Sequence, residues 1–143
     1  MMISEVMTRR VETVSPDTVL EEAANKMKEL DVGVLPVFDG KLLMGMLTDR
    51  DIVIRSVAKG SDPRKTKVSD AMSPEVVSCY DYEELEAVTD RMKTKKIRRI
   101  PVVSREKELI GMVSLADVAE RGDAKEAEET LEKVSEPAEP KRQ

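Results

Sequence analysis

Residues 35–51 read LPVFDGKLLMGMLTDRD, and residues 100–117 repeat the pattern as IPVVSREKELIGMVSLAD. The starts of the two stretches lie 65 positions apart and their Gly-Met ends lie 66 apart, because the second copy holds one inserted residue. Outward from this stretch the offset of 65 aligns further pairs, which are Met7-Thr8 with Met72-Ser73, Val11 with Val76, Leu20 with Leu85, and Met27-Lys28 with Met92-Lys93. The matches fall mainly on apolar, Gly and Pro positions, so they predict a structural unit that occurs twice.

Each copy has the pattern of a strand, a helix, two strands and a second helix, which places the chain in the mixed α/β (α+β) class. In the first copy, residues 11–14 form a short β-branched run, and residues 20–30 place apolar side chains at helical spacing. Thr18 and Glu21 match a capping box, so we expect them to satisfy free N–H groups at the start of that helix. The second helix of each copy is expected from Asp49 to about Ala58 and from Leu115 to Arg121.

The central pair of strands in the first copy is a predicted hairpin. Residues 34–38 and 42–47 flank Asp39-Gly40, a pair suited to the positive φ angles of a tight turn. Pro36 and Pro101 lie inside the first strand of each hairpin. Because proline cannot donate a hydrogen bond to a ladder, we expect these strands to lie at a sheet edge or at a bulge, with free backbone facing a cleft.

The sequence divides into two repeats and a tail. We expect repeat 1 at 3–58, a linker at 59–67 and repeat 2 at 68–121. The remaining residues, 122–143, form an acidic tail rich in Pro and Glu, in which 125–134 has the composition of a short helix. The last eight or so residues are expected to be disordered.

Composition narrows the class of function. The 143 residues are 40% hydrophobic but only 2% aromatic, and no apolar run approaches the ~20 residues that span a bilayer. The first ten residues do not resemble a secretory leader, so a soluble, cytoplasmic protein without membrane contact is expected. The net charge of −5 argues against a general nucleic-acid binder, because phosphate contacts need clustered Lys and Arg.

The chain contains no His and a single Cys, Cys79. This composition argues against a zinc or other soft-metal site and removes the usual general base and the Ser-His or Cys-His nucleophiles. An enzyme is therefore not expected. Cys79 aligns with Val14, and a small buried apolar residue is favoured there over a reactive thiol.

The end of each hairpin carries a hydroxyl followed three residues later by a carboxylate, Thr48 with Asp51 and Ser114 with Asp117. One interpretation is a helix cap, in which the hydroxyl is the N-cap and the carboxylate lies near the positive end of the dipole. The other adds a ligand: the carboxylate accepts hydrogen bonds from a vicinal diol such as a ribose, and the hydroxyl and free N–H groups hold a phosphate. The two interpretations are compatible, and both stay open.

Arg98 and Arg99 mark a difference between the copies, because Gly33-Val34 occupies these positions in the first. Arginine recognises phosphate through a planar fork of donors. Three lysines lie just upstream, which are Lys93, Lys95 and Lys96. The cluster is equally compatible with phosphate binding and with a solvated face that pairs with nearby acids.

With both motifs and their spacing in place, residues 3–121 resemble a tandem pair of cystathionine-β-synthase (CBS) domains, a Bateman module. The resemblance implies two β-α-β-β-α repeats that pack through their sheets with pseudo-twofold symmetry. It also implies two clefts between the repeats that bind adenosyl compounds, among them AMP, ADP, ATP and S-adenosylmethionine.

The resemblance assigns roles to twelve residues. The ribose hydroxyls would be held by Asp51 and Asp117, with Thr48 and Ser114 beside the ribose or phosphate. The phosphate would meet Arg98 and Arg99. The adenine pocket would be lined by Thr13, Val14, Val34, Ser78, Cys79 and Ile100. The first copy departs from the nucleotide-binding pattern at Gly33-Val34, and which Asp shares a cleft with the arginines stays open.

These features predict a stand-alone regulatory module that binds AMP, ADP or ATP, requires no cofactor, and signals to an unknown protein partner without catalysis. A homodimer is expected, because the family often pairs modules and the helix after the first motif offers four apolar residues, Ile52, Val53, Ile54 and Val57. The same four residues could equally pack inside the monomer. The alternative function is a ligand-free scaffold or protein-interaction module. Binding of single-stranded nucleic acid is disfavoured by net acidity and by the lack of aromatic residues for base stacking.

Overall fold

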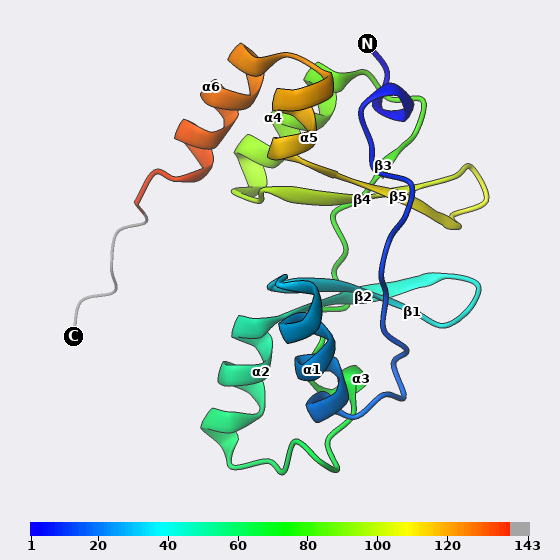
Figure 1. Ribbon diagram of the computed structural model, residues 1–143, viewed down its shortest axis with the longest axis vertical. Helices are drawn as coiled ribbons and strands as arrows, with labels where there is room; N and C mark the ends of the chain where they lie inside the picture. The colour runs from blue at the N-terminus through cyan, green and yellow to red at the C-terminus, as the bar shows by residue number, and fades with distance from the viewer. Residues whose placement is uncertain (138–143) are drawn as a thin grey trace. The chain divides into compact units, whose positions relative to one another are not determined.

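The computed structural model describes residues 1–137 (Figure 1). Its elements in chain order are η1 (Ile3–Glu5), α1 (Leu20–Leu30), β1 (Val34–Phe38), β2 (Leu43–Thr48), α2 (Asp49–Arg55), η2 (Val57–Lys59), α3 (Val68–Ala71), β3 (Cys79–Tyr80), α4 (Leu85–Lys95), β4 (Arg99–Val103), β5 (Leu109–Ser114), α5 (Leu115–Arg121) and α6 (Ala124–Val134). The mixed helix and strand content and the repeated order of elements confirm the predicted fold class. None of the helices in residues 1–137 is both long and apolar enough to cross a membrane.

The elements form two compact units, each of which contains the sheet of one repeat. We call residues 11–77 with 106–109 the first-repeat unit, and residues 1–10, 78–105 and 110 onward the second-repeat unit.

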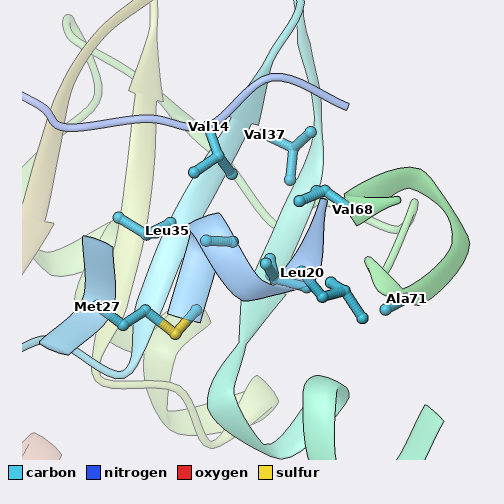
Figure 2. Packing of buried hydrophobic residues seen from close by; sticks show 9 residues of the cluster. Val14, Leu20, Met27, Leu35, Val37, Val68 and Ala71 are labelled. Carbon is cyan, nitrogen blue, oxygen red and sulfur yellow. The ribbon is translucent and has the colours of Figure 1, made fainter. Parts of the chain in front are cut away.

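In the first-repeat unit, β1 and β2 form an antiparallel hairpin that runs from Val34 opposite Thr48 to a bulge between Val37 and Phe38. Val14 adds a parallel bridge to Val37 on the other side of β1. The helices α1 and α2 lie on one face of this hairpin, as Figure 1 shows. Between helices and strands lies a core of nine buried residues (Figure 2), which are Val14, Leu20, Ala23, Met27, Leu35, Val37, Leu47, Val68 and Ala71.

The second-repeat unit repeats this arrangement with an added helix. Its sheet has the order β3-β4-β5, with Cys79 and Tyr80 paired in parallel to Val102 and Val103. The helix α6 packs against α4 and α5, where Ala127 and Thr130 are buried. The tail helix predicted for 125–134 is therefore confirmed to within one residue. The last of the residues predicted to be disordered, 138–143, lie outside the described residues.

The two units exchange equivalent segments of the chain. Residues 1–10 lie at the start of repeat 1 in the sequence but pack in the second-repeat unit, where the Thr8 N–H donates to the Met112 carbonyl (2.8 Å) and the Met112 N–H donates back (2.9 Å). The segment that aligns with them packs in the first-repeat unit, where Met46 and Ser73 exchange the same pair of bonds at 3.0 and 2.9 Å. The aligned Met-Thr and Met-Ser pairs thus mark the strand-like segment that closes the sheet of the other repeat.

This exchange explains the glycine in each Gly-Met motif. A Cβ atom on Gly45 would lie 2.5 Å from the Ser73 carbonyl oxygen, and one on Gly111 would lie 2.8 Å from the Thr8 carbonyl oxygen. Any side chain at these positions would push the exchanged segment off the edge of the sheet.

The capping box expected at Thr18 and Glu21 is wrong. The N-cap of α1 is Val19, and no side chain caps the helix. Backbone carbonyls of the linker accept the free N–H groups instead: Leu20 donates to Thr66 at 2.9 Å and Glu21 donates to Pro63 at 3.0 Å. Tertiary contacts replaced the local cap that the sequence pattern offered.

The expectation of an edge or a bulge for the proline strands holds for β1, which has a bulge between Val37 and Phe38, but the edge position is wrong for β4. The strand β4 is central in its sheet, and β1 lies between β2 and Val14. The missing N–H of Pro36 is not needed, because the Pro36 carbonyl accepts the first bond from Val14 (3.0 Å) and Phe38 donates the next (2.9 Å). In β4 the parallel pairing begins at Val102, after Pro101.

Two expected elements are shorter than predicted. The strand expected at 11–14 is reduced to the single bridge at Val14. The helix expected from Asp49 to Ala58 ends at Arg55, and a 3₁₀ turn, η2, follows. The helix α5, Leu115–Arg121, agrees with its prediction.

Candidate ligand-binding motifs

The first motif lies where β2 ends and α2 begins. The Asp51 N–H donates to Thr48 Oγ1 (3.0 Å), and the Thr48 N–H donates to Asp51 Oδ2 (2.9 Å). This reciprocal pair is a capping box. Asp51 Oδ1 makes no hydrogen bond within residues 1–137, and Arg55 Nε lies 3.9 Å from it. The Asp51 side chain is 16% exposed.

The second motif repeats this geometry between β5 and α5. The Asp117 N–H donates to Ser114 Oγ (3.1 Å), and the Ser114 N–H donates to Asp117 Oδ2 (2.9 Å). Here Asp117 Oδ1 also accepts a hydrogen bond from Thr8 Oγ1 (3.0 Å), and Arg121 Nη1 lies 3.6 Å away. The Asp117 side chain is 14% exposed. The structure therefore contains the predicted cap in both copies, and the capping bonds use only one oxygen of each carboxylate.

The N–H groups of α2 that were expected to be free for a phosphate have partners within the protein. The N–H groups of its first three residues, Asp49 to Asp51, donate to Gly33 O (2.9 Å), Asp49 Oδ1 (2.8 Å) and Thr48 Oγ1 (3.0 Å). In α5 the Leu115 N–H likewise donates to Arg98 O (3.1 Å). A phosphate near the first motif would need side-chain donors.

Arg98 and Arg99 are exposed at the start of β4. Arg98 Nη2 donates to Ser135 Oγ (3.3 Å), just beyond α6. Arg99 makes no hydrogen bond or ion pair within residues 1–137. Of the upstream lysines, Lys93 pairs with Glu126 of α6 (3.4 Å) and Lys96 donates to the Glu136 carbonyl (3.4 Å). The α6 segment thus contacts part of the basic cluster and leaves the Arg99 guanidinium available.

The six residues expected to line an adenine pocket divide by burial. Val14, Cys79 and Ile100 are buried, whereas Thr13, Val34 and Ser78 are half-buried. Thr13 and Val34 belong to the first-repeat unit, and Ser78 belongs to the second. Only these three present surface to a ligand.

Two basic residues that sequence reasoning missed contact the backbone of Thr13 and Ser78. Lys26 Nζ donates to the Thr13 carbonyl (2.5 Å), and Arg91 Nη1 donates to the Ser78 carbonyl (3.0 Å). Lys26 and Arg91 occupy the same position in the two repeats, one residue before Met27 and Met92. The recurrence of a basic residue at this aligned position was the available signal.

Cys79 behaves as the buried apolar residue that its alignment with Val14 predicted. Burial, with the nearby Glu83 carboxylate as the next cause, raises the pKa of the Cys79 thiol to about 12. The thiol is therefore protonated at neutral pH and is a poor nucleophile. Within residues 1–137 no three His, Cys, Asp or Glu side chains are grouped so that they could hold a metal ion.

Both repeats match a known protein family. The sequence model of the CBS domain matches residues 3–57 and 68–123. The chain is 44% identical over 117 residues to the CBS domain-containing protein YhcV of Bacillus subtilis strain 168, which covers 82% of each protein.

Two solved structures share the fold. The crystal structure of Hypoxic Response Protein I with two coordinated zinc ions matches with a TM-score of 0.76 and 33% identity, covering 83% of this chain and 97% of that one. The crystal structure of CBSX2 in complex with AMP matches with a TM-score of 0.74 and 27% identity, covering 82% and 93%.

Proposed function

The chain belongs to the CBS domain family, and from this premise we propose that it is a stand-alone regulatory module that binds an adenosyl ligand of the AMP, ADP or ATP class. It would pass this signal to a protein partner and catalyse no reaction itself. The observation that carries the proposal is the repeated motif, in which the cap uses one oxygen of a partly exposed carboxylate and leaves the other outside the cap. The AMP complex of the related CBSX2 gives the class of ligand.

The chemistry of a nucleotide fits the groups that are available. A carboxylate accepts hydrogen bonds from the two hydroxyls of a ribose, and bonds to a charged acceptor are stronger than neutral ones. A guanidinium that makes no hydrogen bond or ion pair within residues 1–137, as at Arg99, binds phosphate through its fork of donors. Zinc, which Hypoxic Response Protein I coordinates, has no matching group of ligands within residues 1–137.

A thermal-shift screen of the full chain against AMP, ADP, ATP, NAD and S-adenosylmethionine tests the proposal. A ligand that binds only the folded state stabilises it by about 2.7 kcal/mol at 100 times its Kd, so the correct ligand raises Tm by several degrees. Inorganic phosphate and guanosine nucleotides serve as controls for charge alone. No shift with any adenosyl compound would favour the alternative, a ligand-free scaffold.

We also propose that the module is a homodimer. Ile52 packs against the core, but Val53, Ile54 and Val57 of α2 and η2 are 54%, 49% and 61% exposed. Exposed apolar patches of this kind mark interaction sites in soluble proteins.

Val53→Glu combined with Ile54→Glu is expected to convert the dimer to a monomer, because two charges cannot be buried in an apolar interface without partners. Light scattering after size-exclusion chromatography gives the mass. Leu42→Glu, at a site 40% exposed in the hairpin turn, is the matched control and should stay dimeric. A wild-type mass of one chain, or a double variant that remains dimeric, contradicts the assignment of this surface.

A further inference from the structure

We propose that the two motifs are unequal, that Asp51 is the carboxylate that holds the ribose, and that Thr8 is the specificity-determining residue that withholds Asp117 from the ligand. The inference rests on the proposed function. It names which motif serves as the site and which residue decides this.

The two units provide an internal comparison, because every group around Asp117 has a counterpart around Asp51. Thr8 corresponds to Ser73 and Arg121 to Arg55. In both units the exchanged segment makes the same two backbone bonds to the strand of the motif. Both carboxylates accept the same capping bond, and their side chains are exposed to nearly the same extent. Differences in access or backbone geometry therefore do not distinguish the two motifs.

What differs is the partner of the second carboxylate oxygen. Asp117 Oδ1 accepts from Thr8 Oγ1 at 3.0 Å, and Arg121 Nη1 donates to the same Thr8 oxygen at 3.3 Å. Ser73 makes no side-chain hydrogen bond within residues 1–137. Arg55 donates to the Met72 carbonyl (2.9 Å) as Arg121 does to the aligned Met7 carbonyl (3.2 Å), and its Nε lies 3.9 Å from Asp51 Oδ1. The second repeat thus has a closed Arg121–Thr8–Asp117 network that the first repeat lacks.

The Thr8 hydroxyl makes the contact that a ribose hydroxyl would make. Both are alcohols that donate to a carboxylate oxygen, and a vicinal diol needs two such acceptor positions. A ribose at Asp117 would have to displace Thr8 and leave its half-buried hydroxyl without that acceptor, which weakens binding at this motif. At Asp51 the second carboxylate oxygen accepts no hydrogen bond within residues 1–137, so a ribose would break no such bond there.

Calorimetric titration of the full chain with AMP tests the inference. We expect one site in the wild type, a loss of more than tenfold in affinity for Asp51→Asn, and a change of less than about twofold for Asp117→Asn. Asparagine retains a carbonyl acceptor for each cap, so both variants should stay folded. Thr8→Val removes the hydroxyl at constant shape and is expected to add a second, weaker site. Thr8→Ser should keep one site, and Ser73→Ala should change nothing.

Equal losses for the two Asp variants, two sites in the wild type, or a single site in a folded Thr8→Val variant would overturn the inference while leaving nucleotide binding intact. If Thr8→Val does not fold, the pair of Asp variants still decides. Failure of AMP, ADP and ATP to bind the wild type and all variants would instead overturn the proposed function, and the inference with it.

Discussion

Ile3→Ala is expected to destabilise the second-repeat unit, although Ile3 lies at the start of repeat 1 in the sequence. Its side chain is fully buried in that unit, and truncation of a buried Ile to Ala costs about 2–5 kcal/mol. Hydrogen exchange measured by mass spectrometry should show that, relative to the wild type, the variant exchanges faster in α4 and β4 and is less affected in α1 and β1. Tyr80 and Tyr82, stacked with their rings 5.2 Å apart, are the only tyrosines, and their fluorescence reports on the same unit.

Val68→Ala is the matched control, because Val68 aligns with Ile3 and is fully buried in the first-repeat unit. In the Val68→Ala variant, faster hydrogen exchange should be confined to α1 and β1, and the tyrosine fluorescence should be unchanged at low denaturant. An Ile3→Ala variant that loses protection first in α1 and β1, or equally throughout the chain, would show that the exchanged segment does not act on the unit in which it packs.

The sequence predicted the fold well wherever the pattern was local. The repeat offset, the hairpin around Asp39-Gly40 and the helix α5 all follow from hydrophobic spacing and turn chemistry, which depend on neighbours in the chain. The exchange of segments could not be predicted in this way, because spacing does not say which sheet a segment joins. The Gly in each Gly-Met motif is required by the exchanged backbone beside it, and this contact has no signature in the local sequence.

In the candidate site, too, local features could be predicted from the sequence and contacts between distant residues could not. Both capping boxes follow from the three-residue spacing of hydroxyl and carboxylate, so the sequence alone predicts them. The bond from Thr8 to Asp117 joins residues 109 positions apart, and no local pattern reports it. The capping box predicted at Thr18 was wrong for a related reason. Backbone carbonyls of the linker accept hydrogen bonds from the first N–H groups of α1, and no side chain caps this helix.

Replacement of both Arg98 and Arg99 by Ala is expected to weaken AMP, ADP and ATP by about 100-fold and to leave adenosine nearly unchanged. Each guanidinium contributes charge-assisted bonds worth roughly 1.5–3 kcal/mol to a phosphate, and neither senses the base. Arg99 should carry the larger share, because Arg98 is already bonded to Ser135. Competition calorimetry with adenosine and the three nucleotides measures each contribution separately.

The Lys variants of both residues separate charge from geometry, because lysine keeps the charge and removes the fork of donors. They should recover only part of the lost affinity, and raised salt should bring the wild type toward the Ala variant, since screening weakens exposed charges. Lys41→Ala with Lys59→Ala removes two exposed cations elsewhere in the chain and controls for net charge. Equal losses for adenosine and AMP would mean that the arginines support the fold rather than the phosphate. The scaffold function would then be the better account of this chain.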